Sequence, residues 1–128
     1  MKLLLDTHIL LWAMLDDARL SGAARSLLED PENEITVSVI SFYEIAIKAS
    51  LGKSGISCST AQIIDYVRQA AVSVLDLRPA HAITMETLPW HHRDPFDRIL
   101  VSAALTEPAR LVTHDQALAA YSSTIILV

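Results

Sequence analysis

The stretch KLLLDTHILLWAML, residues 2–15, decides the fold of this chain. It opens with a short apolar run, residues 2–5, that is typical of a buried strand, and an apolar helical segment follows at 7–15. Asp6 stands between the two, at the carboxyl end of the expected strand. A strand that leads directly into a helix is the repeating unit of parallel α/β sheets.

The same alternation of strand and helix continues along the whole chain. Further strands are expected where runs are apolar or rich in β-branched residues, at 34–39, 72–77, 111–113 and 124–127. Further helices are expected at 21–30, 41–51, 60–71, 79–88, 95–105 and 115–121, with loops at 53–59 and 89–94. This order predicts an α/β protein whose mostly parallel central sheet of about five strands is covered by helices on both faces.

The composition limits the number of domains and the class of protein. With 128 residues, 52% of them hydrophobic, the chain suits a single domain over 1–128. The mean hydropathy of +0.35 is high for a small monomer, so we expect a partner or a second copy to cover part of its apolar surface. The net charge of −5 argues against a nucleic-acid coat protein with a basic surface, but it does not exclude a nuclease.

The sequence also bears on the compartment. No apolar stretch approaches the roughly 18 residues needed to span a membrane, and the first residues lack the features of a secretory signal. Cys58 is the sole cysteine, so there is no disulfide framework. We therefore expect a cytoplasmic protein without a membrane partner.

Four acidic residues fall at one edge of the expected sheet. Asp6 and Asp115 follow strands, while Glu44 and Asp97 lie in the first turns of expected helices. Ligands of open parallel α/β sheets bind beyond the carboxyl ends of the strands, which is this edge. Four carboxylates gathered there repel one another, and a hard cation relieves that repulsion. The pattern predicts a divalent-metal site that suits Mg²⁺ or Mn²⁺ better than zinc.

Each acid taken singly also has a simpler interpretation as a helix cap. Ser41-x-x-Glu44 fits a capping box. Asp94-Pro95-Phe96-Asp97 fits a helix start, with its first residue as N-cap and its last at the third helical position. The other two acids could likewise cap the helices that follow them. In that interpretation the protein is a non-catalytic α/β binding module.

Four segments resemble the PIN-domain family, and within it the VapC-type toxin ribonucleases of type II toxin–antitoxin pairs. They are Leu4-Leu5-Asp6-Thr7-His8, Ser41-Phe42-Tyr43-Glu44-Ile45, His91-His92-Arg93-Asp94-Pro95-Phe96-Asp97-Arg98 and Val112-Thr113-His114-Asp115. Their order and spacing agree over essentially the whole chain, and the third segment is the most specific. The resemblance implies a single PIN-like three-layer α/β/α sandwich and a Mg²⁺-dependent endoribonuclease in which Mn²⁺ can substitute.

Carried over by position, the resemblance implies catalytic and metal-binding roles for Asp6, Glu44, Asp97 and Asp115. Asp6 and Asp97 are expected to bind the metal ion directly. Glu44 and Asp115 are expected to bind it through a carboxylate oxygen or through a water molecule. Supporting roles are expected for Thr7, Thr113 and Asp94, and Asp94 competes with Asp97 for the third acidic position. Such a site implies metal-assisted hydrolysis of RNA phosphodiesters, with 5′-phosphate and 3′-hydroxyl products.

Binding of an RNA substrate requires positive charge near the site, because phosphate contacts dominate nucleic-acid affinity. The candidate RNA-contacting residues are Lys48, Arg93, Arg98 and His92. Three of them have an alternative. Lys48 could pair only with Glu44, and Arg98 only with Asp94, since each pair is four residues apart. His92 could be a solvated loop residue.

The resemblance further implies a homodimer and a cognate antitoxin, whose tail fills a groove formed by the first, third and fourth helices. Other functions stay open. A PIN-type nuclease can act in RNA processing rather than as a toxin. A metal-independent ribonuclease would use His91, His92 or His114 as acid and base, would survive chelation by EDTA and would leave cyclic phosphates.

Overall fold

The computed structural model describes residues 1–53 and 55–128 and is built around one five-stranded sheet. The strands are β1 (Lys2–Leu5), β2 (Glu34–Ser38), β3 (Ser73–Leu75), β4 (Arg110–Thr113) and β5 (Ile126–Leu127). They lie in the order β3-β2-β1-β4-β5, and all four pairings are parallel. The expected α/β class and the sheet of about five parallel strands are confirmed.

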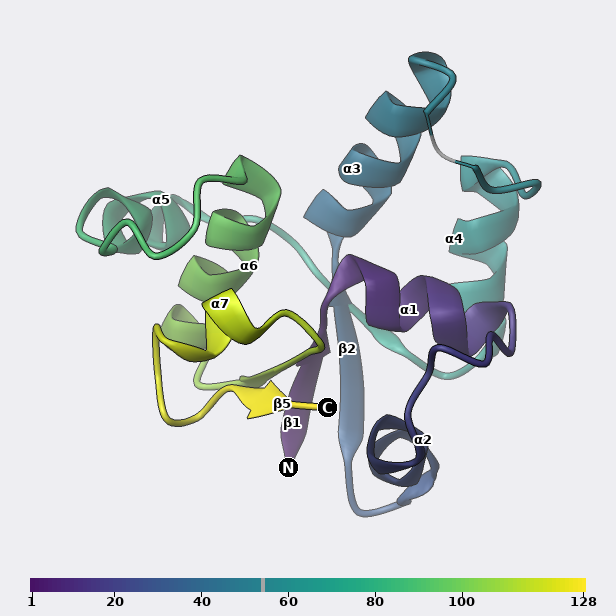
Figure 1. The fold of residues 1–128 in the computed structure, drawn as a ribbon, viewed down its shortest axis with the longest axis horizontal. Coiled ribbons are helices and arrows are strands. Elements are labelled where there is room, and N and C mark those ends of the chain that lie inside the picture. Colours follow the sequence, from purple (N-terminus) through teal and green to yellow (C-terminus); the bar gives the residue numbers. More distant parts are fainter. Residues whose placement is uncertain (54) are drawn as a thin grey trace.

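Seven helices cover this sheet in the part of the chain that the structure describes, and they form two layers. They are α1 (Thr7–Met14), α2 (Gly22–Glu29), α3 (Val39–Ser50), α4 (Thr60–Gln69), α5 (Pro79–Glu86), α6 (Pro95–Thr106) and α7 (Gln116–Ala119). In Figure 1, α1, α2 and α4 lie to the right of the strands, α5 to α7 to the left, and α3 rises from the upper end of β2. The sheet between them makes the protein a three-layer α/β/α sandwich.

The apolar residues of β1 contribute to the hydrophobic core on both faces of the sheet. Leu3 and Leu5 pack in one core cluster with side chains of α1, α2 and α4, whereas Leu4 packs in a second cluster with side chains of α6 and α7. Successive residues of a strand point to opposite faces, and both faces here are covered. This explains why β1 reads as a continuous apolar run rather than as an alternating one.

The start of α3 differs from the expectation. The helix begins at Val39 rather than at residue 41, because Ser38 is its N-cap and accepts a hydrogen bond from the backbone N of Ile40. The expected capping box of Ser41 and Glu44 is therefore wrong. Glu44 lies in the second turn of α3, where its side chain is free to contact another part of the protein.

Several element ends also differ from the sequence prediction. The strands expected at 72–77 and 124–127 are shorter, at three and two residues. Helix α4 buries Ile63 and Val67 as expected, but Ala71 lies beyond its end, exposed, with a φ of +57°. The loop expected at 53–59 includes Ser54, which is outside the described residues. Among those residues, no helix combines the length and apolarity that a membrane span requires.

Candidate active site

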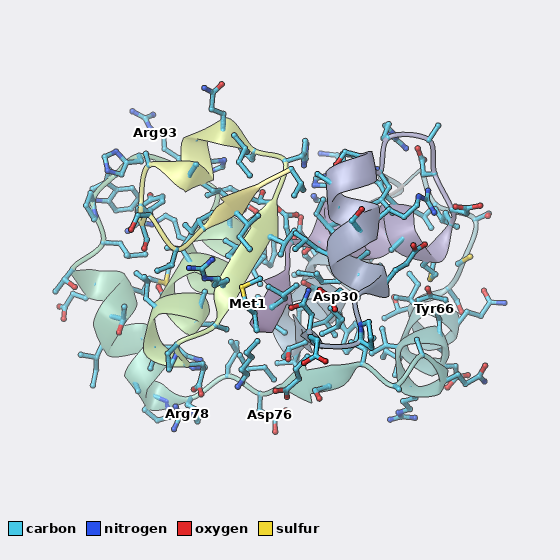
Figure 2. All side chains as sticks on the ribbon, turned by 90° about the horizontal axis from the view of Figure 1, so that it is seen from below. Met1, Asp30, Tyr66, Asp76, Arg78 and Arg93 are labelled. Atoms are coloured by element: carbon cyan, nitrogen blue, oxygen red, sulfur yellow. The ribbon has the colours of Figure 1, made fainter. Side chains whose placement is uncertain are left out.

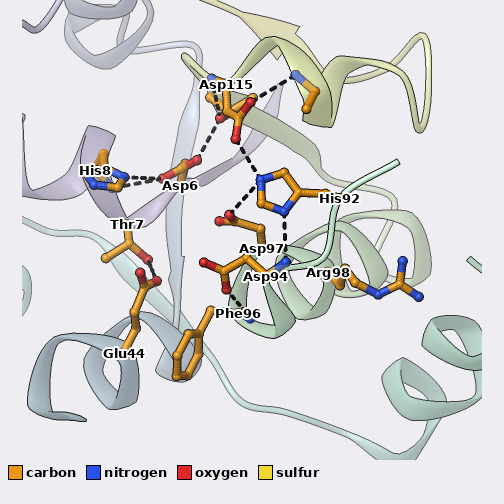
Figure 3. Close-up of polar contacts among 12 residues, drawn as sticks. Asp6, Thr7, His8, Glu44, His92, Asp94, Phe96, Asp97, Arg98 and Asp115 are labelled. Carbon is orange, nitrogen blue, oxygen red and sulfur yellow. Dashed lines mark hydrogen bonds and ion pairs between the residues drawn. The ribbon is translucent and has the colours of Figure 1, made fainter. Parts of the chain in front are cut away.

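The four acids predicted to converge do meet at the carboxyl edge of the sheet. Asp6 follows β1, and Asp115 comes two residues after β4, the strand beside β1. Asp97 is the third residue of α6, and Glu44 reaches the edge from α3. Figure 3 shows these carboxylates facing a common space, with Asp6 between Glu44 and Asp115.

Asp6 and Asp115 each use one carboxylate oxygen as a helix cap and keep the other for the site. Oδ1 of Asp6 accepts from the backbone N of His8, and Oδ1 of Asp115 from that of Ala117, both at 2.9 Å. The second oxygen of Asp6 accepts from Thr113 Oγ1 at 2.7 Å, and that of Asp115 lies 3.0 Å from His92 Nε2. The capping that was expected as an alternative is thus present, and it leaves one oxygen of each acid directed into the site.

The structure distinguishes Asp97 from its competitor Asp94. Asp94 caps α6 by accepting from the backbone N of Phe96 at 2.9 Å. Among the residues that the structure describes, Asp97 forms no capping hydrogen bond, and its Oδ2 lies 3.4 Å from Nε2 of His92. Ligand atoms of Asp97, Asp115 and His92 lie within 4.8 Å of one another. The geometry therefore favours Asp97 as the third acid of the group.

Thr7 and Thr113, for which the resemblance implies supporting roles, both donate hydrogen bonds to carboxylates of the site. Thr113 Oγ1 donates to Asp6 and accepts from the backbone N of Asp115 at 3.0 Å, so one hydroxyl fixes both acids. Thr7 Oγ1 donates to Glu44 Oε1 at 2.8 Å and lies 2.9 Å from Ser41 Oγ. Ser41 was missed as a contact of Thr7, because the sequence assigned its hydroxyl to a capping box.

The charges in this group act strongly on one another. Burial, followed by the like charges of Asp6 and Asp94, raises the pKa of Asp97 to about 7. Burial also tends to raise the pKa of Asp6, but hydrogen bonds from His8 and Thr113 outweigh it and hold that pKa below its ordinary value. Hydrogen-bond donors thus keep Asp6 ionised, whereas Asp97 lacks enough neutralising positive charge around it. A like-charge group of this kind suits a bound cation.

The candidate RNA-contacting residues lie in different surroundings. Lys48 Nζ pairs with Glu44 Oε2 at 2.6 Å, so the expected i, i+4 pair is present at the site. Arg93 is exposed, and Figure 2 shows it projecting outward from the molecule. His92 lies inside the acidic group rather than on the surface around it.

Arg98 differs from both expectations made for it. Its side chain is buried, extends away from the carboxylates and does not pair with Asp94 (Figure 3). The guanidinium instead donates to the carbonyl of Pro89 at 2.8 Å and lies 3.7 Å from the ring centroid of Trp90. Free carbonyls after α5 and an aromatic face supply its partners, so Arg98 is not one of the cations exposed at the site.

A groove of about 450 Å³ opens beside the acidic group, between α1 and α3. Thr7 and Glu44 form its border with the site. Its lining is largely apolar and includes Leu11, Trp12, Ile45 and Ile56, while the cations along it are Arg19, Lys48 and Lys53. Any chain segment seated in this groove would lie directly against Thr7 and Glu44.

Comparisons with known proteins show which family and which fold this chain resembles. Residues 3–123 match the family model of the PIN domain. Ribonuclease VapC22 of Mycobacterium tuberculosis is 31% identical to this chain over 118 residues, which cover 90% of this chain and 88% of the relative.

Two solved structures share the fold. One is VapBC2 from Rickettsia felis bound to a DNA fragment from its promoter, with a TM-score of 0.72 and 20% identity over 100% of this chain and 98% of that one. The other is VapBC-1 from nontypeable Haemophilus influenzae, with a TM-score of 0.67 and 21% identity over 100% and 97%. At these identities the similarity shows the fold alone.

Proposed function

Because the chain belongs to the PIN-domain family, we propose that it is a divalent-metal-dependent endoribonuclease and the toxin of a type II toxin–antitoxin pair. The observation that carries the proposal is the convergence of Asp6, Glu44, Asp97 and Asp115 at one sheet edge. RNA as the substrate class is supported by the relative named as a ribonuclease.

The donor set of this site fits a hard divalent cation. Oxygen atoms of Asp97 and Asp115 lie within 4.8 Å of each other, and the charge of Asp6 is the strongest like charge acting on Asp97. Carboxylate oxygens suit Mg²⁺ and Mn²⁺. We assign Asp6 and Asp97 as direct ligands, with Glu44 and Asp115 binding directly or through water. Bound there, the cation would polarise a water molecule and the scissile phosphate for hydrolysis.

The side chains around the acids would keep them in place during the reaction. Each of Asp6 and Asp115 is held by a backbone N–H on one oxygen and by a side-chain donor on the other. Glu44 is held by Thr7 and Lys48. Groups fixed in this way need little reorganisation when the substrate binds, and such preorganisation is a large part of catalysis.

Substrate RNA would be bound through its phosphates by exposed cations near the site. Arg93, on the loop before α6, is the best placed of the candidates because it is exposed and projects into solvent. Lys48 lies at the site but is shared with Glu44. Lys53 lines the groove, is exposed, and adds a further positive charge there.

The groove between α1 and α3 is the proposed binding site of the cognate antitoxin. Its largely apolar lining suits the apolar face of a helix or tail, and an occupant would cover Thr7 and Glu44. A solved structure that shares this fold is a toxin–antitoxin complex from Klebsiella pneumoniae. We also propose a homodimer, since large apolar side chains such as Ile83 and Trp90 are 70% and 75% exposed.

The test uses the purified full chain and several unrelated labelled RNAs with Mg²⁺, Mn²⁺ or EDTA. We expect metal-dependent cleavage that leaves 5′-phosphates and that is abolished in Asp6→Asn. Asp65→Asn is the matched control, because Asp65 is an exposed acid on α4 and its loss should leave cleavage unchanged. Thermal unfolding of each variant confirms that the fold is kept.

The same assay separates the alternatives. The capping contacts of Asp6, Asp94 and Asp115 favour a non-catalytic binding module as the second candidate. Folded wild-type protein that leaves every RNA intact with either metal would support that module. Cleavage that persists in EDTA and leaves cyclic phosphates would support histidine catalysis instead. Growth arrest that a neighbouring small gene relieves would separate a toxin from an RNA-processing nuclease.

A further inference from the structure

The loop of residues 89–94, between α5 and α6, is held by two side chains that the proposed function does not use. Arg98 is 3% exposed and extends under this loop from α6. Its Nη1 donates to the Pro89 carbonyl at 2.8 Å and to the Tyr121 hydroxyl at 3.1 Å, while Trp90 covers its guanidinium. A buried arginine with these contacts fixes the start of the loop.

The hydroxyl of Tyr121 fixes the middle of the same loop. It accepts from the backbone N of His92 at 3.0 Å as well as from Arg98, and it lies 3.5 Å from the carbonyl of His92. The ring of Tyr121 also packs edge-on against His91, with centroids 4.9 Å apart. One phenolic oxygen therefore joins α6, the segment after α7 and His92, the loop residue that enters the acidic group.

The backbone of this loop determines which ring nitrogen of His92 carries the hydrogen. The N–H of Asp94 donates to His92 Nδ1 at 3.0 Å, so Nδ1 is the accepting, unprotonated nitrogen and Nε2 bears the hydrogen. Nε2 lies 3.0 Å from Asp115 Oδ2 and 3.4 Å from Asp97 Oδ2. A nitrogen that bears a hydrogen cannot ligate a cation. His92 is thus a hydrogen-bond donor between two carboxylates, although its position resembles that of a metal ligand.

We propose that Tyr121 and Arg98 are positioning residues of the active site: they fix the loop so that the Nε2–H of His92 holds Asp97 and Asp115 toward one point. Tyr121, Arg98 and His92 act through the carboxylates and do not contact the cation. Partners that orient metal ligands typically contribute about 10–100-fold to metal affinity or activity. The inference rests on the proposed function.

The main test is Tyr121→Phe, which removes a single oxygen and leaves the ring in place. We expect the affinity of the metal-free full chain for Mg²⁺ alone, measured by calorimetry, to weaken by about 10-fold. At saturating Mg²⁺ we expect kcat on RNA to fall by a similar factor, with KM within about twofold, since no phosphate contact is lost. Tyr66→Phe on α4 loses an equivalent hydroxyl far from the loop and is the matched control.

A second measurement follows the imidazole nitrogens of His92 by ¹⁵N NMR. We expect Nε2 to keep its hydrogen in the wild type with and without Mg²⁺, and His92→Gln, which keeps a side-chain N–H donor, to retain more Mg²⁺ affinity than His92→Ala. Loss of the Nε2 hydrogen on addition of Mg²⁺ would make His92 a ligand and overturn the proposal. Arg98→Lys, which keeps the charge but not the forked contacts, should resemble Tyr121→Phe.

Failure of the positioning role and failure of the proposed function give different results. If folded Tyr121→Phe binds Mg²⁺ and cleaves RNA like the wild type, the positioning role is overturned and the nuclease stands. If the wild type binds Mg²⁺ but cleaves no RNA, the proposed function fails, while the Mg²⁺ affinities and the NMR signals still decide the role of the loop.

Discussion

Thr113 Oγ1 donates a 2.7 Å hydrogen bond to Asp6 Oδ2 and so links two residues that are 107 positions apart in the chain. The contact is possible because β1 and β4 are parallel neighbours and both residues stand where these strands end. Both side chains are buried. Since the same hydroxyl accepts from the backbone of Asp115, it couples the placement of two of the four acids.

Replacing Thr113 tests this coupling. Thr113→Val keeps the shape of the side chain but leaves a buried carboxylate oxygen without its donor, which should lower the free energy of unfolding by about 1–3 kcal/mol. We expect Mg²⁺ affinity to fall about 10-fold, as for other partners of metal ligands. Thr113→Ser retains the hydroxyl and should stay near the wild type in chemical denaturation and in calorimetry. Equal Mg²⁺ affinity of the valine and serine variants would contradict the role of this hydroxyl.

Asp94 and Asp97 should respond differently to substitution. Asp94→Ala removes the N-cap of α6 and should cost about 1 kcal/mol of unfolding free energy, whereas Asp94→Ser keeps a capping oxygen and should cost little. Both variants should retain most metal-dependent cleavage. Asp97→Asn should lose cleavage without losing stability, because the side chain that caps α6 is that of Asp94. An Asp94→Ser protein that is folded but inactive would instead place Asp94 among the ligands.

The fold and the positions of the acids could be predicted because they depend on local pattern. The apolar run before Asp6 and the β-branched run before Asp115 mark strand ends, and parallel strands bring their carboxyl ends to one edge. Asp94-Pro95 marks the start of α6, which places Asp97 in its first turn. The boundary of α3 was misjudged because both Ser38 and Ser41 are good N-caps, and only packing decides between them.

The surroundings of Arg98 and His92 could not be predicted, because their partners are distant in the chain. Spacing alone suggested that Arg98 pairs with Asp94, yet the side chain turns to carbonyls after α5 and to Tyr121. The orientation of His92 depends on a loop whose conformation Tyr121 fixes from 29 positions away. Sequence periodicity reports which face a residue occupies, but not which of several polar groups it meets there.

Arg93 should contribute to RNA binding through charge alone. Arg93→Gln is expected to reduce the slope of log affinity against log salt concentration by about 0.7, the value for one phosphate contact with single-stranded nucleic acid. Arg110→Gln is the control, since Arg110 is exposed at the opposite end of the sheet, where β4 begins. Fluorescence anisotropy in EDTA measures binding without cleavage. Equal slopes for the two variants would remove Arg93 from the RNA path.

The raised pKa of Asp97 predicts how the stability of the metal-free protein depends on pH. Burial, with the charges of Asp6 and Asp94, raises that pKa from 3.8 to about 7. Between these values the folded protein holds a proton that the unfolded chain releases, so the free energy of unfolding falls as the pH rises from about 4 to about 7. Asp97→Asn lacks the titrating carboxyl group, so its free energy of unfolding in EDTA should depend less on pH.

The comparison of wild type with Asp97→Asn isolates this effect from other titrations. The lowered pKa of Asp6 acts in the opposite sense, because its stabilising contribution is lost only as the pH falls below the ordinary range of an aspartate. The raised pKa of His8, caused first by its hydrogen bond to Asp6, adds a loss of stability as the pH rises past its usual value. Both contributions are common to the two proteins and largely cancel in the difference between their denaturation curves.

Saturating Mg²⁺ requires the ionised carboxylate, so it should abolish the fall of the wild type's free energy of unfolding with rising pH. A difference curve that stays level from pH 4 to 7 in EDTA would mean that Asp97 is already ionised without a cation.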